Sequence, residues 1–139
     1  YHLYHKKNPF LEDRAYYFPY KMDVDKMQQA ARILFDYADF TSFSKRNTQV
    51  KNFRCHILRS DWEVREDQLI YHVQANRFLR GMVRGLTGTM LLIGRGTVDL
   101  DEFRAIINSK DCSRANFAVP GHGLFLEKVH YPDGYFNGF

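Results

Sequence analysis

The segment from Arg77 to Ile93 constrains the fold of this chain more than any other part of its sequence. On a helical wheel at about 100° per residue, one side of the segment collects its large apolar residues, which are Phe78, Leu79, Met82, Val83, Leu86, Met90 and Ile93. Asn76 stands where a residue could cap the helix, and Gly94 stands where glycine commonly ends one. The pattern predicts a helix over 77–93 whose apolar side packs against a sheet.

The opposite side of this predicted helix carries arginines and glycines, namely Arg77, Arg80, Gly81, Arg84 and Gly88. Gly81, Gly85 and Gly88 each cost the helix about 1 kcal/mol relative to alanine. A glycine within a helix usually indicates that something approaches the backbone closely. Leu91 and Leu92 lie near this side as well. We therefore expect a helix that is covered on both sides, with arginines directed into a second contact or a cleft. A solvated surface stripe is the alternative.

The remaining elements follow from apolar periodicity and from capping residues. Strands are predicted at 1–6, 50–64, 69–75 and 124–131, further helices from Asp23 or Asp25 to Phe35 and after the capping box of Asp99 and Glu102, and loops at 7–21, 39–49 and 66–68. Apart from the short third helix, this order is that of a ferredoxin-like β-α-β-β-α-β unit. We therefore predict an α+β fold in which an antiparallel sheet carries its helices on one face.

Composition limits the classes of protein to which the chain can belong. Its 139 residues fit one domain or part of a larger one, and the formal charge of +4 permits an acidic partner such as nucleic acid without requiring it. Cys55 and Cys112 show no CxxC spacing, so we expect no zinc site and two free thiols in a reducing cytoplasm. No apolar run approaches the roughly 20 residues of a membrane span. Because the chain starts without Met inside a predicted strand, we expect a fragment of a longer protein.

Four parts of the sequence match landmarks of one known family, in the order that the family has them. They are residues 76–84 with Gly88, residues 39–43, residues 123–126 with Val129 and Tyr131, and Tyr1. The run Asn-Arg-Phe-Leu-Arg-Gly-Met-Val-Arg at 76–84 resembles a signature segment of the tRNA pseudouridine synthase A family. Tyr1 resembles the second tyrosine of that family's Arg-x-Tyr-x-Tyr strand. The resemblance covers almost the whole chain.

This resemblance implies an enzyme that isomerises uridine to pseudouridine in the anticodon stem-loop of tRNA, without a metal or a cofactor. The implied partners are tRNA, an N-terminal domain of the same chain, and a second copy in a homodimer. The family's nucleophile is an aspartate within a Gly-Arg-Thr-Asp segment, which this sequence lacks. Residues 1–139 therefore resemble the C-terminal domain of such an enzyme, with the nucleophile upstream, and alone they are expected to be inactive.

Two residues take roles from the resemblance. Arg84 matches the arginine that pairs with the catalytic aspartate. A nearby guanidinium lowers the pKa of a carboxyl group and so keeps the nucleophile ionised in a partly dry cleft. Leu124 matches an apolar residue that lines the pocket for the target base, and a base turned out of its stack needs such a wall. An ordinary core leucine is the alternative for Leu124.

Other residues are weaker candidates for contact with RNA. Tyr1 and Arg80 are expected to bind substrate or brace the cleft. Phosphate contacts are expected from Lys45, Arg46, Lys51 and Arg77, although short basic runs often form only a solvated loop. The sequence departs from the family's Ala-Pro-Ala at Val119-Pro120-Gly121 and has a bulky Phe117. These departures are expected to alter the rim of the pocket without touching the arginine helix.

Two other classes of function compete with this interpretation. A non-catalytic RNA-binding module of ferredoxin-like fold would expose two or three aromatic rings on its sheet for base stacking. A purely structural or dimerising domain would bury the aromatic stretch Phe53–Trp62 at an interface.

Overall fold

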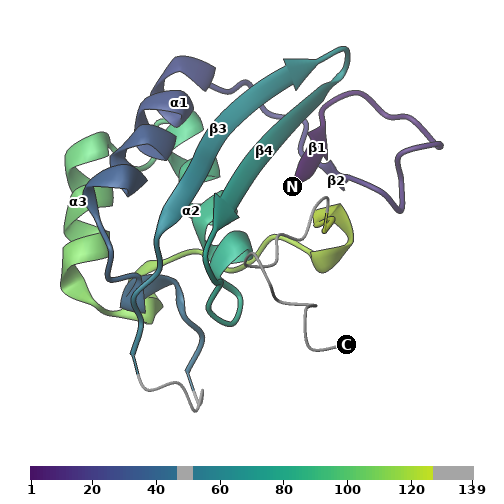
Figure 1. Ribbon diagram of the computed structural model, residues 1–139. Coiled ribbons are helices and arrows are strands. Elements are labelled where there is room, and N and C mark those ends of the chain that lie inside the picture. The colour runs from purple at the N-terminus through teal and green to yellow at the C-terminus, as the bar shows by residue number, and fades with distance from the viewer. Residues whose placement is uncertain (47–51, 127–139) are drawn as a thin grey trace, which may run out of the picture.

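The computed structural model describes residues 1–46 and 52–126 (Figure 1). Its strands are β1 (His2–Tyr4), β2 (Tyr16–Tyr17), β3 (Ile57–Arg65) and β4 (Gln68–Ala75), and its α-helices are α1 (Val24–Ile33), α2 (Met82–Gly94) and α3 (Leu100–Ser109). Four short 3-10 helices complete the described elements, η1 (Leu34–Asp36), η2 (Thr41–Phe43), η3 (Cys112–Arg114) and η4 (Gly121–Gly123).

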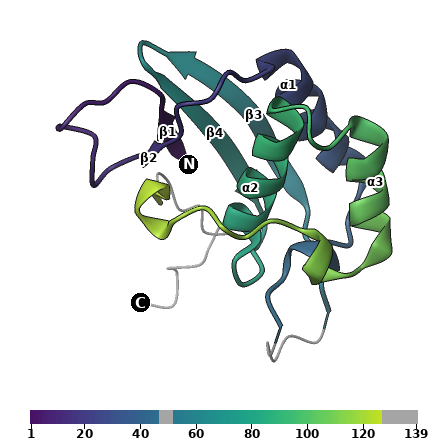
Figure 2. The ribbon, with the colours of Figure 1, turned by 180° about the vertical axis from the view of Figure 1, so that it is seen from behind.

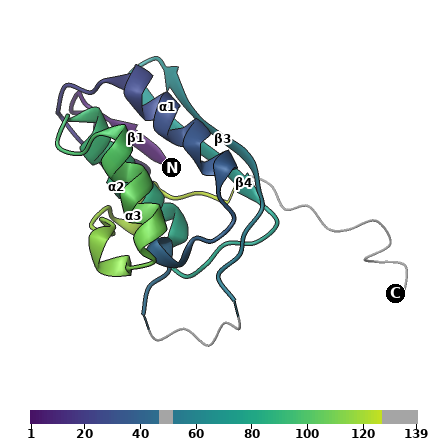
Figure 3. The ribbon, with the colours of Figure 1, turned by 90° about the vertical axis from the view of Figure 1, so that its left-hand side faces the viewer.

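The sheet has the order β2-β1-β4-β3, with β4 antiparallel to both β1 and β3. Because β4 lies between β1 and β3, the central strands have the split arrangement of a ferredoxin-like unit. The short β2 pairs parallel with β1. The sheet is therefore mixed at this edge, whereas an antiparallel sheet was expected. The helices all lie on one side of the sheet (Figure 3). The predicted α+β class and its one-sided helices are therefore confirmed.

The core lies between this sheet and α1, α2 and α3. Trp62 of β3 stacks on Tyr71 of β4 with ring centroids 4.9 Å apart, and its indole N–H points to the sulfur of Met90 on α2 at 3.5 Å. Tyr71 is fully buried, and Leu69, Val73 and Ala75 pack against the same cluster. This is the apolar face that alternation along 69–75 predicts, and it is confirmed.

Two of the predicted helix starts are confirmed by the caps that they form. The Asp23 carboxylate accepts the backbone N–H of Lys26 at 3.1 Å, and that of Asp99 accepts the N–H of Glu102 at 2.7 Å. The helix after Asp23 tightens into η1 at Leu34. A 3-10 turn has three residues per turn, so it changes the phase of the side chains. Phe35, expected on the buried face, is therefore 51% exposed.

The prediction that the arginine helix begins at Arg77 is wrong, because α2 starts at Met82. Gly81 has a φ of +74°, a left-handed conformation that does not continue a helix. Asn76 does not cap α2. Its backbone N–H donates to the carbonyl of His56 at 3.0 Å, and its side-chain oxygen accepts the N–H of His56 at 2.7 Å.

Several predicted strands have other bounds in the structure. The strand predicted at 50–64 begins only at Ile57, and before it Arg54 forms an isolated bridge with Asp39. The strand predicted at 1–6 is confined to His2–Tyr4. Of the strand predicted at 124–131, residues 124–126 are not in a strand, and the rest lie outside the described residues.

Candidate active site around Arg84

The arginine side of α2 is covered by the segment Ala115–Pro120, which we call the strap. Figure 2 shows it crossing the start of α2 on its way from η3 to η4. A Cβ atom on Gly85 would lie 2.6 Å from the ring of Phe117, and one on Gly88 would lie 2.1 Å from the carbonyl oxygen of Asn116. A side chain at Gly85 would therefore displace the Phe117 ring, and one at Gly88 would displace the backbone of the strap. The prediction of a close approach to this side of the helix is confirmed.

Arg84 stands in the first turn of α2 and points along the strap. Its Nε donates to the carbonyl of Val119 at 2.9 Å, and its Nη2 donates to that of Phe117 at 3.3 Å. Within residues 1–46 and 52–126, no carboxylate forms an ion pair with it. Carbonyl groups orient a guanidinium but do not neutralise its charge. The partly buried cation is thus held in place and still able to bind an anion.

The contacts of Arg84 correct one expectation. Phe117 and Val119 were expected to leave the arginine helix untouched, and this is wrong because both lie on the strap and supply its carbonyl acceptors. Gly121, the third departure, would accept a Cβ with nothing within 4 Å.

Tyr1 meets the same strap from the sheet. Its hydroxyl donates to the carbonyl of Pro120, and a Cβ on Gly123 would lie 2.7 Å from its ring. Burial raises the pKa of the Tyr1 phenol well above its usual value, Tyr16 adds to the rise, and the Arg84 guanidinium opposes it. The phenol therefore stays protonated at neutral pH and serves as a hydrogen-bond donor. The strap thus accepts bonds from both Tyr1 and Arg84.

Leu124 follows the strap directly after η4. Its N–H donates to the carbonyl of Gly121 at 3.0 Å, and its side chain is 40% exposed. The next residue, Phe125, meets the ring of His2 edge-on at 5.1 Å between centroids. A leucine of this exposure is no core residue of the described part of the chain, which speaks against the alternative. The apolar wall for the target base stays a prediction.

Among the described residues, the predicted RNA-contact cation Lys45 lies at the strap, and Arg80 lies beside Lys45. The Lys45 side chain packs along Gly81, with its Nζ 6.0 Å from the centre of the Phe117 ring. The backbone N–H of Lys45 donates to the carbonyl of Arg80 at 2.9 Å, and the Arg80 side chain is exposed. The Lys45 side chain therefore borders the strap, and Arg80 is linked to Lys45 through the backbone.

The other predicted cations have different neighbours. Arg77 donates from Nη1 to both oxygens of Asn52 at 3.2 Å. Arg46 lies at the surface beside Cys112 and Asp111. Lys51 lies outside the described residues. The structure thus gathers Tyr1, Arg84, Lys45 and Leu124 around the strap, with Arg80 beside Lys45. Arg77 binds Asn52 instead, and Arg46 lies beside η3.

Sequence reasoning missed Asn116 and Lys110. Asn116 fastens the strap to α2, and the two glycines that face it were the signal that could have located it. Lys110 and Lys45 both line a hollow of about 300 Å³ between η2 and η3, where the Lys110 Nζ lies 3.4 Å from Asp39. Asp39 in the Asp39–Phe43 landmark indicated that a cation could lie nearby. No sequence spacing connects Asp39 with Lys110, so Lys110 itself could not be singled out.

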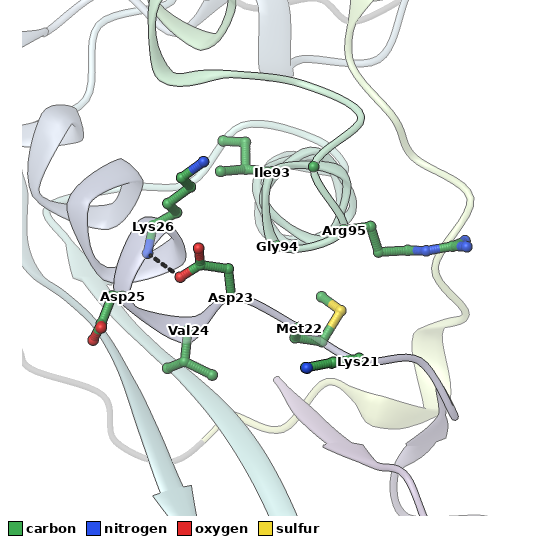
Figure 4. A pocket seen from close by; sticks show the side chains of 10 residues that line it. Lys21, Met22, Asp23, Val24, Asp25, Lys26, Ile93, Gly94 and Arg95 are labelled. Carbon is green, nitrogen blue, oxygen red and sulfur yellow. Dashed lines mark hydrogen bonds between the residues drawn. The ribbon is translucent and has the colours of Figure 1, made fainter.

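A second hollow, of about 610 Å³, lies at the far end of α2 (Figure 4). Met22, Asp23 and Lys26 line it from the start of α1, and Arg95 from the end of α2. Asp23 is already used as the helix cap, and the charges around the hollow are mixed. It has no part in the site around Arg84.

Comparison with known proteins identifies the family of this chain. Residues 30–132 match the family model described as tRNA pseudouridine synthase. The chain belongs to this family. It is 45% identical over 136 residues to the tRNA pseudouridine synthase A of Parabacteroides distasonis, an alignment that covers 98% of this chain and 54% of the relative.

More distant members of the tRNA pseudouridine synthase family align over a similar length. Identity is 41% to the tRNA pseudouridine synthase A of Bacteroides thetaiotaomicron, over 94% of this chain and 50% of that protein. It is 37% to the one of Bacillus subtilis, over 94% of this chain and 54% of that protein. The chain thus spans about half the length of the curated relatives that it matches.

The structure also weighs on the two competing hypotheses. In the described strands no aromatic ring is fully exposed, since Tyr4, Trp62 and Tyr71 are buried and the others are partly covered. This is not the exposed stacking face of a sheet-type RNA-binding module. Trp62 belongs to the chain's own core and is not available for an interface. None of the helices in the described residues is long and apolar enough to cross a membrane.

Proposed function

We propose that this chain is the C-terminal domain of an enzyme that converts uridine to pseudouridine in the anticodon stem-loop of tRNA. Arg84 pairs in that enzyme with a nucleophilic aspartate supplied from outside these residues. The observation that carries the proposal is the state of Arg84, whose partly buried guanidinium is oriented by two backbone carbonyls and lacks a carboxylate partner in the described part of the chain. Family membership and the match over residues 30–132 support it.

The reaction explains why the site needs such a cation. The N1–C1′ bond of uridine breaks, the base rotates, and a C5–C1′ bond forms, so that N1 gains a proton and C5 loses its hydrogen. A carboxylate nucleophile must be ionised for this, and a guanidinium beside it favours the ionised form. The reaction proposed for the complete enzyme uses neither a metal nor a cofactor.

The other residues around the strap suit the binding of a nucleotide. Leu124 offers an exposed apolar side chain as a wall for the target base. Lys45 borders the strap, the exposed Arg80 lies beside Lys45, and both suit phosphate groups of the RNA backbone. Arg46 and Arg77 are further candidates for phosphate contact, as is Lys51, which lies outside the described residues. Tyr1 braces the strap through Pro120.

The proposal extends to the partners and the compartment of the enzyme. Exposed Phe125 and Leu126 suit burial against the N-terminal domain of the same chain. Leu58 and Val64, both more than half exposed on the outer strand β3, suit the contact of a homodimer. A tRNA substrate and two free cysteines fit a cytoplasmic enzyme.

The test replaces Arg84 with alanine in the complete enzyme. Its substrate is tRNA tritiated at C5 of uridine, because every pseudouridine formed releases that hydrogen. We expect turnover to fall by roughly 10²- to 10³-fold, with a much smaller loss of tRNA affinity, because the ion pair acts on the nucleophile. Arg104→Ala is the matched control, since Arg104 pairs with Asp36 at the surface. Unchanged turnover in Arg84→Ala would refute the proposal.

If the complete protein binds tRNA but releases no tritium, the result would instead support the hypothesis of a non-catalytic RNA-binding protein. Arg84→Lys refines the result when activity is found. Lysine keeps the charge but loses the planar fork that meets a carboxylate and the two carbonyls together. We therefore expect its turnover to lie between those of the wild type and Arg84→Ala.

A further inference from the structure

Besides the bonds from Arg84, Asn116 fastens the strap to α2. Its backbone N–H donates to the hydroxyl of Thr89 at 3.0 Å, and its side-chain Nδ2 donates to the carbonyl of Gly88 at 3.4 Å. Thr89 is fully buried, and its hydroxyl donates in turn to the carbonyl of Gly85 at 2.7 Å. Asn116 is therefore tied to α2 by both its backbone and its side chain.

The same side chain also controls the strap beyond it. The Oδ1 of Asn116 accepts the backbone N–H of Ala118 at 3.0 Å, a bond that asparagine commonly makes two residues ahead. That N–H belongs to the peptide unit that also contains the carbonyl of Phe117. A peptide unit is planar and trans, so its C=O points opposite to its N–H. By holding the N–H of Ala118, Asn116 fixes the direction of the Phe117 carbonyl.

The Phe117 carbonyl is one of the two acceptors of Arg84. The other, that of Val119, belongs to the Val119–Pro120 peptide unit, two units beyond the one held by Asn116. Thr89 and Gly88 thus hold Asn116, and Asn116 holds the Phe117–Ala118 peptide. That peptide in turn binds Arg84. We propose that Asn116 is a positioning residue that sets the orientation of the Arg84 guanidinium for catalysis, through the Phe117–Ala118 peptide.

The inference rests on the proposed function, because it matters only if Arg84 acts on a nucleophile. Its physical basis is that a group held in its working geometry before substrate binds need not be ordered during the reaction. Displacement of a catalytic group by about 1 Å can reduce a rate 10²-fold. Asn116 itself touches neither the substrate nor the nucleophile. Its effect is expected on the rate of the chemical step and not on the binding of tRNA.

The experiment uses the complete enzyme with Asn116→Ala, which loses both side-chain bonds, and Asn116→Ser, whose hydroxyl can still accept the N–H of Ala118, though more weakly. Single-turnover rates are measured with C5-tritiated tRNA at saturation. We expect a loss of about tenfold or more in Asn116→Ala and a smaller one in Asn116→Ser, with the Kd for tRNA unchanged. Because a displaced Arg84 stabilises the carboxylate less, the acidic limb of the rate profile should move to higher pH.

Thr87→Val is the matched control for a change on α2 close to the contacts of Asn116 with Gly88 and Thr89. Thr87 is buried on α2 like Thr89, but its hydroxyl has no partner in the described residues. The rate and the pH profile of the Thr87→Val enzyme should therefore equal those of the wild type. The variants are assayed below the melting temperature of each, measured by circular dichroism. If Asn116→Ala does not fold, Asn116→Ser carries the test, with the same shift of the acidic limb expected.

The double variant of Asn116→Ala and Arg84→Ala separates the two proposals. A residue that acts only through Arg84 adds no further loss once Arg84 is gone. A slow Arg84→Ala enzyme with a fast Asn116→Ala enzyme, or losses that multiply in the double variant, would overturn the positioning role and leave the proposed function standing. An Arg84→Ala enzyme as fast as the wild type would overturn both.

Discussion

Thr87 and Thr89 are both fully buried on α2, but only the hydroxyl of Thr89 has a partner among the described residues. Thr89 accepts the backbone N–H of Asn116 and donates to the carbonyl of Gly85. A buried hydroxyl that lacks a partner has lost its bonds to water without replacing them. Two residues of one type on one helix thus make opposite contributions to stability.

Replacement of each threonine with valine should therefore shift stability in opposite directions. Thr87→Val exchanges an unsatisfied hydroxyl for a methyl group of similar size and should stabilise the chain by about 1 kcal/mol. Thr89→Val leaves the N–H of Asn116 without its acceptor and should destabilise it by about 1–3 kcal/mol. Urea unfolding at an unchanged slope measures both. A shift in the same direction for both variants would show that the hydroxyl bonds do not decide the outcome.

Gly88→Ala should destabilise the chain although alanine is the better helix former. The propensity gain is about 1 kcal/mol. Against it, the new Cβ would lie 2.1 Å from the carbonyl oxygen of Asn116, which is backbone and cannot rotate away. Overpacking of this kind typically costs about 1–3 kcal/mol, and here the strap itself must move. We expect a lower melting temperature together with weaker catalysis in the complete enzyme, because the carbonyls around Arg84 move with the strap.

Gly121→Ala is the control for that experiment. Gly121 follows the strap in η4, and a Cβ there would meet nothing within 4 Å. Its melting temperature should stay close to that of the wild type. If Gly88→Ala were as stable as Gly121→Ala, the strap would be looser than the structure indicates.

The packing of α2 could be predicted because its glycines report on a distant segment. Gly85 and Gly88 would not persist on a solvated helix face without cost, so their positions indicated a covering element that the structure identifies as the strap. The start of the helix could not be predicted in the same way. Gly81 looks like another helical glycine, and its left-handed φ of +74° depends on the backbone around it, where Lys45 binds the carbonyl of Arg80.

The site was predictable only where side chains carry its chemistry. Arg84 could be singled out from its helix and from the family motif. Its observed acceptors are backbone carbonyls of Phe117 and Val119, and a carbonyl is present at every residue, so no residue type marks it. Asn116 was missed for a related reason. Its role depends on a contact with Thr89, 27 residues earlier, and not on any local pattern.

The Asp39 carboxylate should make the stability of the chain depend on pH in acid. Partial burial alone would raise its pKa, but hydrogen bonds from the hydroxyl and the backbone N–H of Thr41, together with Lys110, outweigh burial and hold the pKa below the usual 3.8. A folded-state pKa below the unfolded value means that the ionised group stabilises the fold. That contribution is complete above the unfolded value and is lost as pH falls through the lower folded value.

Asp39→Asn tests this directly, because an asparagine oxygen can still accept the N–H of Thr41 while the charge is absent. Urea unfolding would be measured from pH 6 down to roughly pH 2, a range that spans the ordinary pKa of an aspartate. We expect the wild type to lose more stability than Asp39→Asn on acidification, with the two curves converging at the lowest pH. Since Lys110 contributes at the surface, 1 M salt should narrow the difference. Parallel curves throughout would mean that the Asp39 charge does not stabilise this end of the molecule.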